Sequence, residues 1–560
     1  MPDTVTSVRE LADEFVTTMC DQDPPVATFF GLDGAHDKLG DLSEEADRRF
    51  ADRYADLARQ AFEIYPATLT PADAITRAVV IQQADTRIRM TESRMVEYAI
   101  TDFFVAPAAV LLTIMPMLAP ATPELAEAYL GRLSEVPRFL RQAADRHRQG
   151  IAAGRTPVAH LVSAATKHID RYLADPEHDP LAVAAPAAGP ADFADRRDQL
   201  LADVVRPAFA AYRDTLTAEI LPHGRPADRP GLSWLPGGEL WYGNLVRAHT
   251  TTTRTPEELH RTGLDIIDAL RDEYAELGGR VLGTTDQAEI FRRLKTDEEL
   301  RWRTADELLD AARQAIARAE AAAPRWFNLR PERSCEVRPV PEAEAPGAAA
   351  AYYMAPSVDG RRPGVYFANT HQVTERFRHQ SEATAFHEAV PGHHFQMSLS
   401  LGLDDLPMLR RIADVNAYGE GWGLYSERLA DEMGLYSDDI AKLGMLTADS
   451  MRAGRLVVDT GMHAKGWSRQ RAVDFLSEHT PMAAVEIDAE TDRYIAYPGQ
   501  ALSYMVGRLE IQRIRAKAEA ALGDAFDIRG FHDVVLGNGQ LPMPVLADVV
   551  DTWVASHAAG

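Results

Sequence analysis

Cysteine is almost missing from this sequence: Cys20 and Cys335 are the only two in a chain of 560 residues. Two thiols so far apart exclude both a disulfide framework and a zinc site built from cysteine. Such scarcity is typical of a reducing compartment. The stretch MPDTVTSVRELADEF also lacks the basic start and apolar core of a secretory signal, so we expect a cytoplasmic location.

Positive charge is also scarce. The chain has 59 Lys and Arg against 84 Asp and Glu, which gives a formal net charge of −25. Such a surface repels the phosphates of nucleic acids and anionic lipid head groups, so we expect neither as a partner. Hydrophobic residues at 46% and charged residues at 26% fit a soluble globular protein with a sizeable core. The composition does not indicate an oligomeric state.

Only one uncharged run, residues 103–122, is long enough to raise the question of a membrane span. It contains Pro107, Pro116 and Pro120, each of which interrupts helical hydrogen bonding where lipid offers no replacement partner. No cluster of basic residues flanks the run. We therefore expect a buried, kinked segment of the core.

Most of the chain shows apolar residues at three- and four-residue spacing, the pattern of amphipathic helices. Thr255 followed by Pro256 and Glu258 makes a capping-box start for one of them. We expect a mainly α fold. The clearest helices are predicted at residues 4–20, 45–65, 123–150, 255–278 and 304–324.

Strand signals are few. AAYYMAP and RPGVYFANT are short, aromatic and β-branched, and the turn-prone SVDGRR separates them, so they predict a small β-hairpin. The Pro- and Ala-rich residues 175–195 are the best loop candidate. Because similar helical texture flanks this loop, we expect a single body over residues 1–560. Within it, residues 1–330 form a helical N-terminal half and residues 331–560 a metal-binding catalytic half.

The stretch FHEAVPGHHFQ starts like the zinc-hydrolase signature HExxH. In that signature two histidines four residues apart share one helical face and bind one zinc, and the glutamate faces the metal-bound water. Here His387 and Glu388 fill the first two positions, but Pro391 stands where the second histidine belongs. The run 374–386 predicts a helix ahead of the motif. Since proline interrupts helical hydrogen bonding, we expect a kink or a π-type bulge at this point.

Two histidines follow the proline. Two extra residues taken up in a bulge bring His393 to the position of an i+4 histidine, so we favour His393 as the second ligand. His394 is the alternative, and the histidine that is not a ligand is expected to support the site or to contact substrate. A catalytic zinc needs a third protein ligand. Glu420, between two glycines at the start of a predicted second helix, supplies it, with Glu427 as the alternative.

Four ordered blocks of the sequence resemble the bacterial domain-of-unknown-function 885 (DUF885) family: HEAVPGHHFQ, YGEGWGLYSERLADEMGLY, VVDTGMHAKGWSRQRAVDFL and RYIAYPGQALSYMVGRLEI. DPPVATFFGLDGAHDKLGDLS and HTTTTRTPEELHRTGLDII resemble it too, so the likeness runs nearly end to end. Members are regarded as zinc-dependent peptidases related to helical oligopeptidases and carboxypeptidases. The resemblance implies a large helical body with a deep central channel and a peptide or peptide-like substrate. Some actinobacterial members are expected to act on specialised metabolites.

Zinc-hydrolase chemistry needs a polarised carbonyl, an activated water and hydrogen-bond donors for the oxyanion. Zn²⁺ on the three expected ligands meets the first need, and Glu388 takes a proton from water and delivers it to the leaving amine. The related helical peptidases are similar in placing a His and Tyr pair downstream of the metal helix, which implies His463 and Tyr504. For Arg493 and Arg508 we favour pairing with local acids over contact with substrate. The candidates for contact with substrate are His394, Tyr497, Gln500 and Tyr353.

Two other classes of protein fit part of this pattern. Two histidines and a carboxylate also describe the facial triad of non-haem iron enzymes. Such an enzyme has no use for a general base beside a ligand, so Glu388 favours hydrolysis. A non-catalytic helical binding protein is the third hypothesis, and the intact candidates for every catalytic role speak against it. We therefore predict a zinc-dependent hydrolase that cleaves an amide bond.

Overall fold

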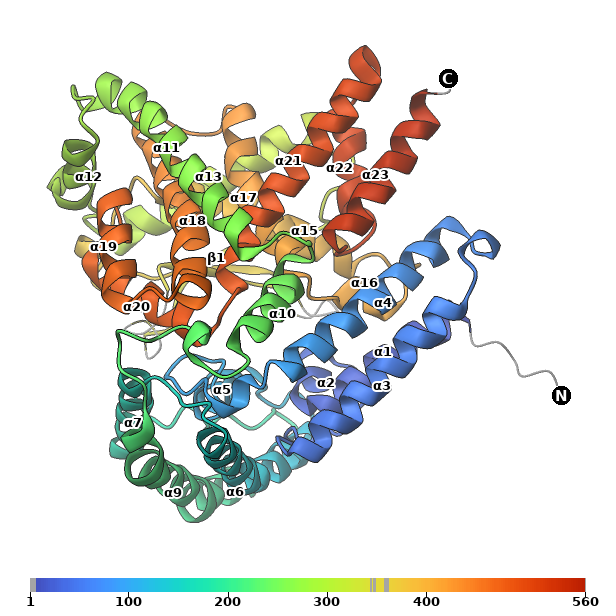
Figure 1. Ribbon diagram of the computed structural model, residues 1–560, viewed down its shortest axis with the longest axis vertical. Helices are drawn as coiled ribbons and strands as arrows, with labels where there is room; N and C mark the ends of the chain where they lie inside the picture. Colours follow the sequence, from blue (N-terminus) through green and yellow to red (C-terminus); the bar gives the residue numbers. More distant parts are fainter. Residues whose placement is uncertain (1–6, 343–344, 346–348, 357–361, 559–560) are drawn as a thin grey trace.

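The computed structural model describes residues 7–342, 345, 349–356 and 362–558. The fold is mainly α, as predicted (Figure 1). The helices before the sheet are α1 (Val8–Gln22), α2 (Pro24–Phe30), α3 (Glu44–Glu63), α4 (Pro71–Glu92), α5 (Pro107–Met117), α6 (Pro123–Ala152), α7 (Ala159–Ala174), α8 (Phe193–Leu200), α9 (Arg206–Thr215), α10 (Gly238–Thr250), α11 (Pro256–Val281), α12 (Gln287–Thr296) and α13 (Ala305–Ala322). Those after it are α14 (Ser381–Glu388), α15 (His393–Leu401), α16 (Met408–Ile412), α17 (Asn416–Glu432), α18 (Asp439–Lys465), α19 (Arg469–His479), α20 (Ala484–Ala496), α21 (Ser503–Leu522), α22 (Ile528–Leu536) and α23 (Met543–Ala558).

The helix signals in the sequence are confirmed where they are local. The Thr255 hydroxyl accepts from the backbone N–H of Glu258, whose carboxylate accepts from the N–H of Thr255, so the predicted capping box starts α11. Residues 175–192, between α7 and α8, are not helical, as the loop prediction requires. The uncharged run at residues 103–122 contains α5, a helix of 11 residues with Pro116 inside it. Within the described residues, no helix combines the length and the apolar character that a bilayer span requires.

The helix that leads into the histidine motif starts later than predicted. α14 begins at Ser381, whereas the expected helix began at residue 374. The intervening backbone is bonded elsewhere: Trp302 N–H donates to Arg376 O at 3.1 Å, and Arg378 N–H donates to Leu300 O at 2.7 Å. Because the backbone at residues 376–378 forms hydrogen bonds with residues 300–302, it cannot form the helical hydrogen bonds that the sequence predicts.

The small sheet contains the predicted hairpin and one further strand. β2 (Ala351–Met354) pairs antiparallel with β3 (Val365–Ala368), as expected. β1 (Glu336–Pro339) pairs parallel with β3 on its other side and was not predicted. The order β1-β3-β2 leaves β2 at an edge, where it packs against α14 and α15. The predicted turn falls largely on residues 357–361, which lie outside the described residues.

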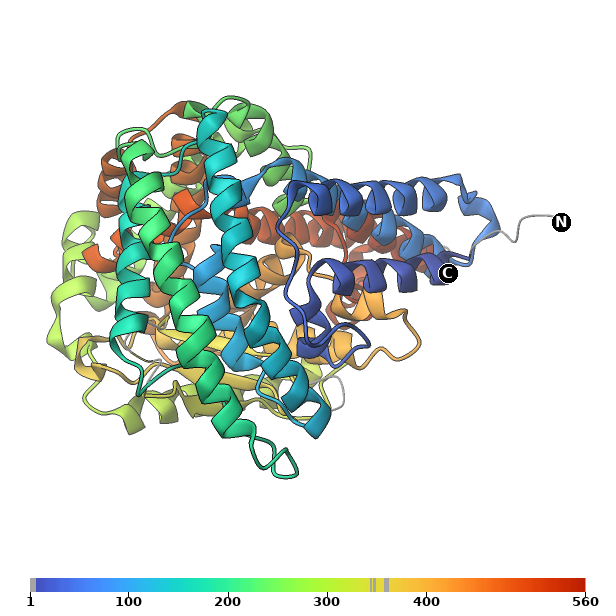
Figure 2. The ribbon, with the colours of Figure 1, turned by 90° about the horizontal axis from the view of Figure 1, so that it is seen from below.

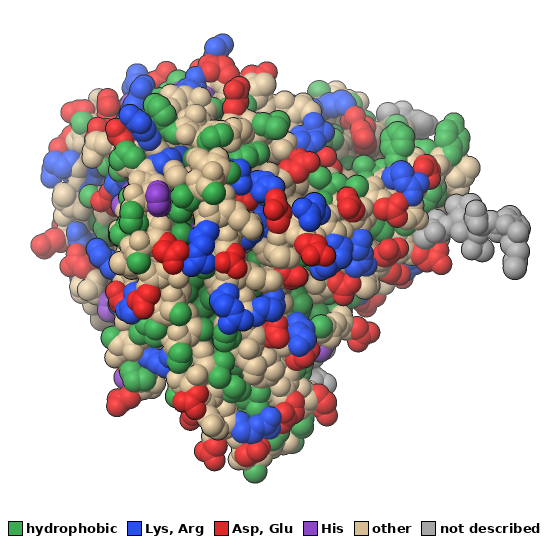
Figure 3. All heavy atoms as spheres, turned by 60° about the horizontal axis from the view of Figure 1, so that its bottom comes forward, with side chains coloured by type: hydrophobic (Ala, Val, Ile, Leu, Met, Phe, Trp, Pro, Cys, Tyr) green, Lys and Arg blue, Asp and Glu red, His purple; other side chains and the backbone are tan. Residues whose placement is uncertain are grey.

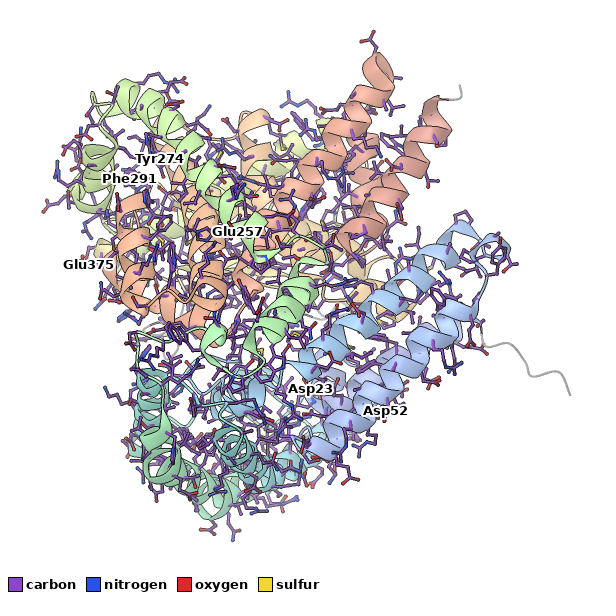
Figure 4. The ribbon with its side chains drawn as sticks, viewed as in Figure 1. Asp23, Asp52, Glu257, Tyr274, Phe291 and Glu375 are labelled. Carbon is purple, nitrogen blue, oxygen red and sulfur yellow. The ribbon has the colours of Figure 1, made fainter. Side chains whose placement is uncertain are left out.

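One large hydrophobic core joins distant parts of the chain. It takes side chains from α1, α3 and α4, from α11 to α13, and from α14, α17 and α21 to α23. Tyr274 of α11, for example, packs edge-on against Phe291 of α12 with ring centroids 4.9 Å apart (Figure 4). A second core lies among α5 to α9. The two ends of the chain thus contribute to the core around the histidine motif.

The arrangement in space follows from these cores. α1, α3 and α4 extend from the body as a group in both ribbon views (Figures 1 and 2). On the face drawn in Figure 3, acidic and basic side chains are interspersed over the surface. The central channel and the division at residue 330 stay predictions.

Candidate metal centre

The two histidines of the motif lie on two short helices separated by a break. α14 carries His387, and Ala389 N–H closes its last turn by donating to Ala385 O at 2.9 Å. α15 begins at His393, and residues 389–392 join the two helices. The helix therefore stops and restarts, which corrects the expected kink or bulge. The break nevertheless brings the two imidazoles together, with ring centroids 4.8 Å apart.

α17 holds this break in place. Pro391, which follows a cis peptide bond, has a carbonyl oxygen that accepts from Trp422 Nε1 at 2.8 Å and from Ser426 Oγ at 3.3 Å. Trp422 and Ser426 are four residues apart and share one face of α17. Gly392 is needed at the same contact, because a Cβ there would lie 1.8 Å from His387 O. The histidine break is thus tied to the helix that carries the predicted third ligand.

Three side-chain atoms converge at this contact. Oε2 of Glu420 lies 3.5 Å from Nε2 of His387 and 3.3 Å from Nε2 of His393. The ligand atoms of the three residues all lie within 4.8 Å of one another. A tetrahedral zinc with bonds of about 2.0–2.1 Å holds its ligand atoms about 3.3–3.4 Å apart. Both the donor set and the separations involving Glu420 therefore fit a divalent metal such as zinc.

Glu427 forms a hydrogen bond with the nitrogen of His387 that does not face Glu420. Its Oε1 lies 2.8 Å from Nδ1 of the imidazole, which favours a proton on Nδ1 and leaves Nε2 to bind a metal. Burial alone would lower the pKa of His387, but hydrogen bonds with Glu420 and Glu427 raise it to about 9. Burial likewise opposes ionisation of Glu420, yet hydrogen bonds with both histidines hold its pKa well below the usual range. The carboxylates of Glu420 and Glu427 thus place negative charge on both sides of His387, which favours a cation at this position.

The imidazole of His387 lies against a glycine of α17. A Cβ on Gly423 would lie 2.7 Å from Cε1 and 2.9 Å from Nε2 of His387, closer than real Cβ atoms come to other atoms. Gly423 stands three residues after Glu420 and four before Glu427, so all three share one face of α17. On this face, Glu420 supplies a candidate ligand, Gly423 leaves room for the imidazole of His387, and Glu427 supplies the carboxylate that contacts Nδ1 of that imidazole.

Two predicted catalytic residues border the cluster. Glu388 directly follows His387 at the end of α14 and is partly exposed. The ring of Tyr504, at the start of α21, stacks on His387 with centroids 6.3 Å apart and an interplanar angle of 20°. Burial and the charge of Glu420 raise the pKa of Tyr504, so its hydroxyl stays protonated and able to donate. The side chain of Glu420 is 24% exposed, so the cluster is open to solvent.

Comparison with known proteins places this chain in a family. Residues 24–550 match the family model described as "Bacterial protein of unknown function (DUF885)". The chain belongs to the DUF885 family. The match confirms the resemblance carried by the four motifs, while the relation to peptidases stays a prediction.

Two solved structures share the fold of this DUF885 protein. One is described as a "putative lipoprotein" from Colwellia psychrerythraea; it is 28% identical with a TM-score of 0.89, over 98% of this chain and 100% of that one. The other is described as a "putative lipoprotein of unknown function" from Shewanella oneidensis, 16% identical with a TM-score of 0.75, over 97% and 99% of the two chains. At that identity the second likeness concerns the fold alone. No curated protein matches the chain.

His394 of the DUF885 protein points away from the three ligand atoms. Its Nδ1 lies 2.9 Å from the hydroxyl of Tyr353, and its Nε2 lies 3.0 Å from the carbonyl oxygen of Arg333. Both ring nitrogens are thus engaged within the protein, which favours His393 as the ligand. The Tyr353–His394 pair ties β2 to α15. His394 also lines a pocket of about 400 Å³, together with Val390.

His463 lies outside the cluster of His387, His393 and Glu420. Its Nδ1 accepts from Leu232 N–H at 3.1 Å, and its Nε2 donates to Tyr494 O at 3.0 Å. The ring is fully buried and stacks on Tyr242 with centroids 5.2 Å apart. Burial lowers the pKa of His463 to about 4. This geometry contradicts the predicted catalytic role and gives His463 a structural one.

The remaining predicted residues, Tyr497 and Gln500, lie between the end of α20 at Ala496 and the start of α21 at Ser503. Gln500 Oε1 accepts from Arg493 Nη1 at 3.0 Å. Tyr497 packs edge-on against His249 with centroids 5.1 Å apart, as an ordinary core aromatic does. Arg493 and Arg508 pair with local acids, as favoured from the sequence: Nε of Arg493 lies 3.2 Å from Glu490 Oε1, and Arg508 pairs with Asp449.

Sequence reasoning missed two arginines of α18. Cζ of Arg455 lies 4.5 Å and Cζ of Arg452 lies 5.9 Å from the centre of the Tyr504 ring. They are three residues apart on a helix with many charged residues, a spacing that also describes a solvated face. Only the packing of α18 against α14 and α21 brings them beside the metal centre.

Proposed function

We propose that this DUF885 protein is a metal-dependent hydrolase that cleaves an amide bond in a peptide or a peptide-like small molecule. The observation that carries the proposal is the convergence of Nε2 of His387, Nε2 of His393 and Oε2 of Glu420. Two imidazoles and a carboxylate are the protein ligands of a class of zinc hydrolases. These three residues would hold one Zn²⁺.

A bound zinc ion would supply a Lewis acid for the scissile carbonyl and lower the pKa of a water molecule. The residues around the metal would transfer the proton and stabilise the oxyanion. Glu388, next to a ligand and partly exposed, would accept the proton of the attacking water and pass it to the leaving amine. The protonated hydroxyl of Tyr504 would donate a hydrogen bond to the developing oxyanion.

The sheet offers a place for the substrate backbone. β2 is an edge strand that packs against α14 and α15, the two helices that carry the histidines. Its residues are only partly buried. An extended peptide can pair with such an edge through main-chain hydrogen bonds. We propose that the segment containing Tyr353 receives the substrate in this way.

Hydrolysis is tested with the variant Glu388→Gln. The purified protein is incubated with zinc and a mixture of short peptides, and the products are identified by mass spectrometry. We expect cleavage with gain of one water and no uptake of oxygen, which also separates a hydrolase from a non-haem iron enzyme. Glu388→Gln should retain the metal while the rate falls about a hundredfold or more.

A matched control is Glu375→Gln, which removes the exposed glutamate labelled in Figure 4. Its carboxylate pairs with Arg301. The cleavage rate of Glu375→Gln should equal that of the wild type. An unchanged rate for Glu388→Gln would remove that residue from the mechanism. Binding of metal without cleavage of any peptide or amide would favour the non-catalytic hypothesis instead.

For location we propose the cytoplasm, on the ground that both cysteines are free and buried. The two solved relatives are described as putative lipoproteins, which raises export as the alternative. Fractionation of cells that express the native gene separates the two, since recovery with the membrane fraction would contradict a cytoplasmic location.

A further inference from the structure

Three arginines gather around Tyr504 beside the metal centre. Arg452 and Arg455 come from α18, and Arg493 comes from α20. The guanidinium carbons of Arg455 and Arg452 lie 4.5 Å and 5.9 Å from the centre of the tyrosine ring. The same ring stacks on His387. A single aromatic side chain therefore separates a metal-site histidine from a group of positive charges.

Two of the three arginines share one carboxylate as their ion-pair partner. Arg455 Nη2 and Arg493 Nε share one carboxylate, that of Glu490, at 2.8 Å and 3.2 Å. Arg452 Nη2 lies 3.7 Å from Glu427 Oε1, too far for a hydrogen bond, and that oxygen is already bonded to a metal-site imidazole. Among the described residues, the ion pairs of these three guanidinium groups thus involve only the carboxylates of Glu490 and Glu427, although Glu486 and Asp449 also lie near enough to interact with the charge of Arg452.

Three buried donors of the group lack a hydrogen-bond partner among the described residues: Nε of Arg452, Nη1 of Arg455 and Nε of Arg493. The 3.2 Å contact of Arg493 Nε with Glu490 Oε1 is an ion pair without hydrogen-bond geometry, so the donors of Arg452 and Arg455 are the two that have no such contact. Arg455 as a whole is only 5% exposed. Buried N–H groups are nearly always paired, and an exception calls for an explanation such as a ligand that completes the site.

We propose that Arg452 and Arg455 bind a carboxylate of the substrate, close to the amide bond that the metal centre would cleave. The inference rests on the proposed function and narrows its substrate class to peptides or peptide-like molecules with a negative charge near the scissile bond. Guanidinium groups suit this task because they offer paired, charge-assisted hydrogen bonds to a carboxylate.

Two sources can supply such a carboxylate. One is the α-carboxylate at the C-terminus of a peptide, which would make the enzyme an exopeptidase. The other is the side chain of an aspartate or glutamate within the peptide. Both present the same chemistry to the arginines, so the experiment must separate them.

Binding is measured by isothermal titration calorimetry with Glu388→Gln, so that no probe is cleaved. The probes are N-acetyl-Ala-Ala, the same dipeptide with a C-terminal amide, and N-acetyl-Ala-Glu-Ala amide. We expect the free acid to bind at least about tenfold more tightly than its amide, the loss expected from one charge-assisted contact. Tighter binding of the glutamate probe than of both dipeptides would assign the carboxylate to a side chain. Equal affinity of all three probes, or no binding by any, would overturn the proposal.

In the Glu388→Gln protein, the further substitution Arg452→Gln should abolish the tighter binding of the probes that carry a carboxylate. Arg455→Lys is the second variant. It keeps the positive charge but loses the paired N–H donors of the guanidinium, so it should reduce the difference in affinity between the probes with and without a carboxylate. Arg469→Gln is the matched control, because Arg469 pairs with Asp488 and Asp492 outside the group. A preference that survives in both Arg452→Gln and Arg455→Lys would contradict the assignment.

The titration is repeated after the metal is removed with a chelator, which separates this inference from the proposed function. If the carboxylate probes bind more tightly and the arginine variants lose this difference, but the wild type hydrolyses nothing, only the proposed hydrolase activity is refuted. Hydrolysis by the wild type together with equal affinity for all three probes would refute only the carboxylate site.

Discussion

Nδ1 of His387 and Oε1 of Glu427 lie 2.8 Å apart in the interior of the protein, with 4% and 1% of their side chains exposed. A buried carboxylate behind a histidine fixes the plane of the ring, selects the tautomer and makes the other nitrogen a better donor to a metal. Glu427 was the alternative third ligand from the sequence. The structure instead places it behind His387, while Glu420 faces both imidazoles.

Replacing Glu427 by glutamine should weaken the metal site without destroying it. The amide oxygen can still accept from Nδ1 of His387, but the charge that strengthens the bond is gone. We expect zinc affinity to fall about tenfold to a hundredfold, measured by competition with a chelating dye. Glu432→Gln, near the end of the same helix and paired with Arg515, is the control and should bind zinc as the wild type does. Wild-type affinity in Glu427→Gln would contradict the role given to this carboxylate.

Gly423→Ala tests the close approach of α17 to the metal site. The new Cβ would lie 2.7 Å from Cε1 of His387 and should displace the imidazole, which lowers zinc affinity by at least about tenfold. Gly419→Ala is the matched control on the same helix, because its nearest contact is the side chain of Gln540 at 3.8 Å. It should keep zinc and gain up to about 1 kcal/mol of stability from helix propensity. Similar zinc affinity in both variants would refute the steric argument.

His463→Ala should destabilise the fold and leave the chemistry intact. The substitution leaves Leu232 N–H and Tyr494 O without a buried partner, at a cost of about 2–4 kcal/mol in the free energy of unfolding. Urea unfolding measures the loss, and zinc affinity and the cleavage rate of the folded protein should stay close to those of the wild type. The opposite pattern, normal stability with a rate at least about a hundredfold lower, would restore the catalytic role expected from the sequence.

The protein should lose stability steeply in mild acid. Each of several buried histidines has a pKa near 6.5 in the unfolded chain and a much lower one in the folded protein, so the unfolded state takes up protons first as pH falls. The free energy of unfolding should therefore drop between about pH 7 and 4, by about 1.4 kcal/mol per pH unit for each histidine. Burial lowers the pKa to about 4 in His147, His249, His379 and His463, and to about 3 in His532.

Urea unfolding at several pH values checks this expectation. His463→Gln keeps a donor and an acceptor but does not titrate, so its stability should fall less steeply by about 1.4 kcal/mol per pH unit. The same slope in the variant and the wild type would show that His463 is not a buried neutral histidine.

The fold was predictable where its signals are local. α6 runs from Pro123 to Ala152, almost as its apolar spacing predicts, and the capping box at Thr255 starts α11. The failures are non-local. β1 has one apolar β-former, Val337, and its pairing partner β3 lies far along the chain. The backbone at residues 376–378 looks helical in sequence but is bonded to residues 300–302.

The candidate site shows the same division. The motif spacing singled out His387, His393 and Glu420, and the structure brings their ligand atoms within 4.8 Å of one another, although their role as metal ligands stays a prediction. The motif spacing could not tell that His463 forms structural hydrogen bonds, because its partners, Leu232 N–H and Tyr494 O, come from two other segments of the backbone. Nor did it single out Arg452, whose position beside the cluster depends on how α18 packs against α14 and α21.

The metal content of the purified protein tests the account most directly. After incubation with zinc and extensive dialysis, inductively coupled plasma mass spectrometry should find about one zinc per chain in the wild type and in Glu388→Gln. His393→Ala and Glu420→Ala should lose it, whereas His394→Ala should keep it. Absence of any tightly bound divalent metal from the wild type, or loss of metal in His394→Ala with retention in His393→Ala, would contradict the metal centre described above.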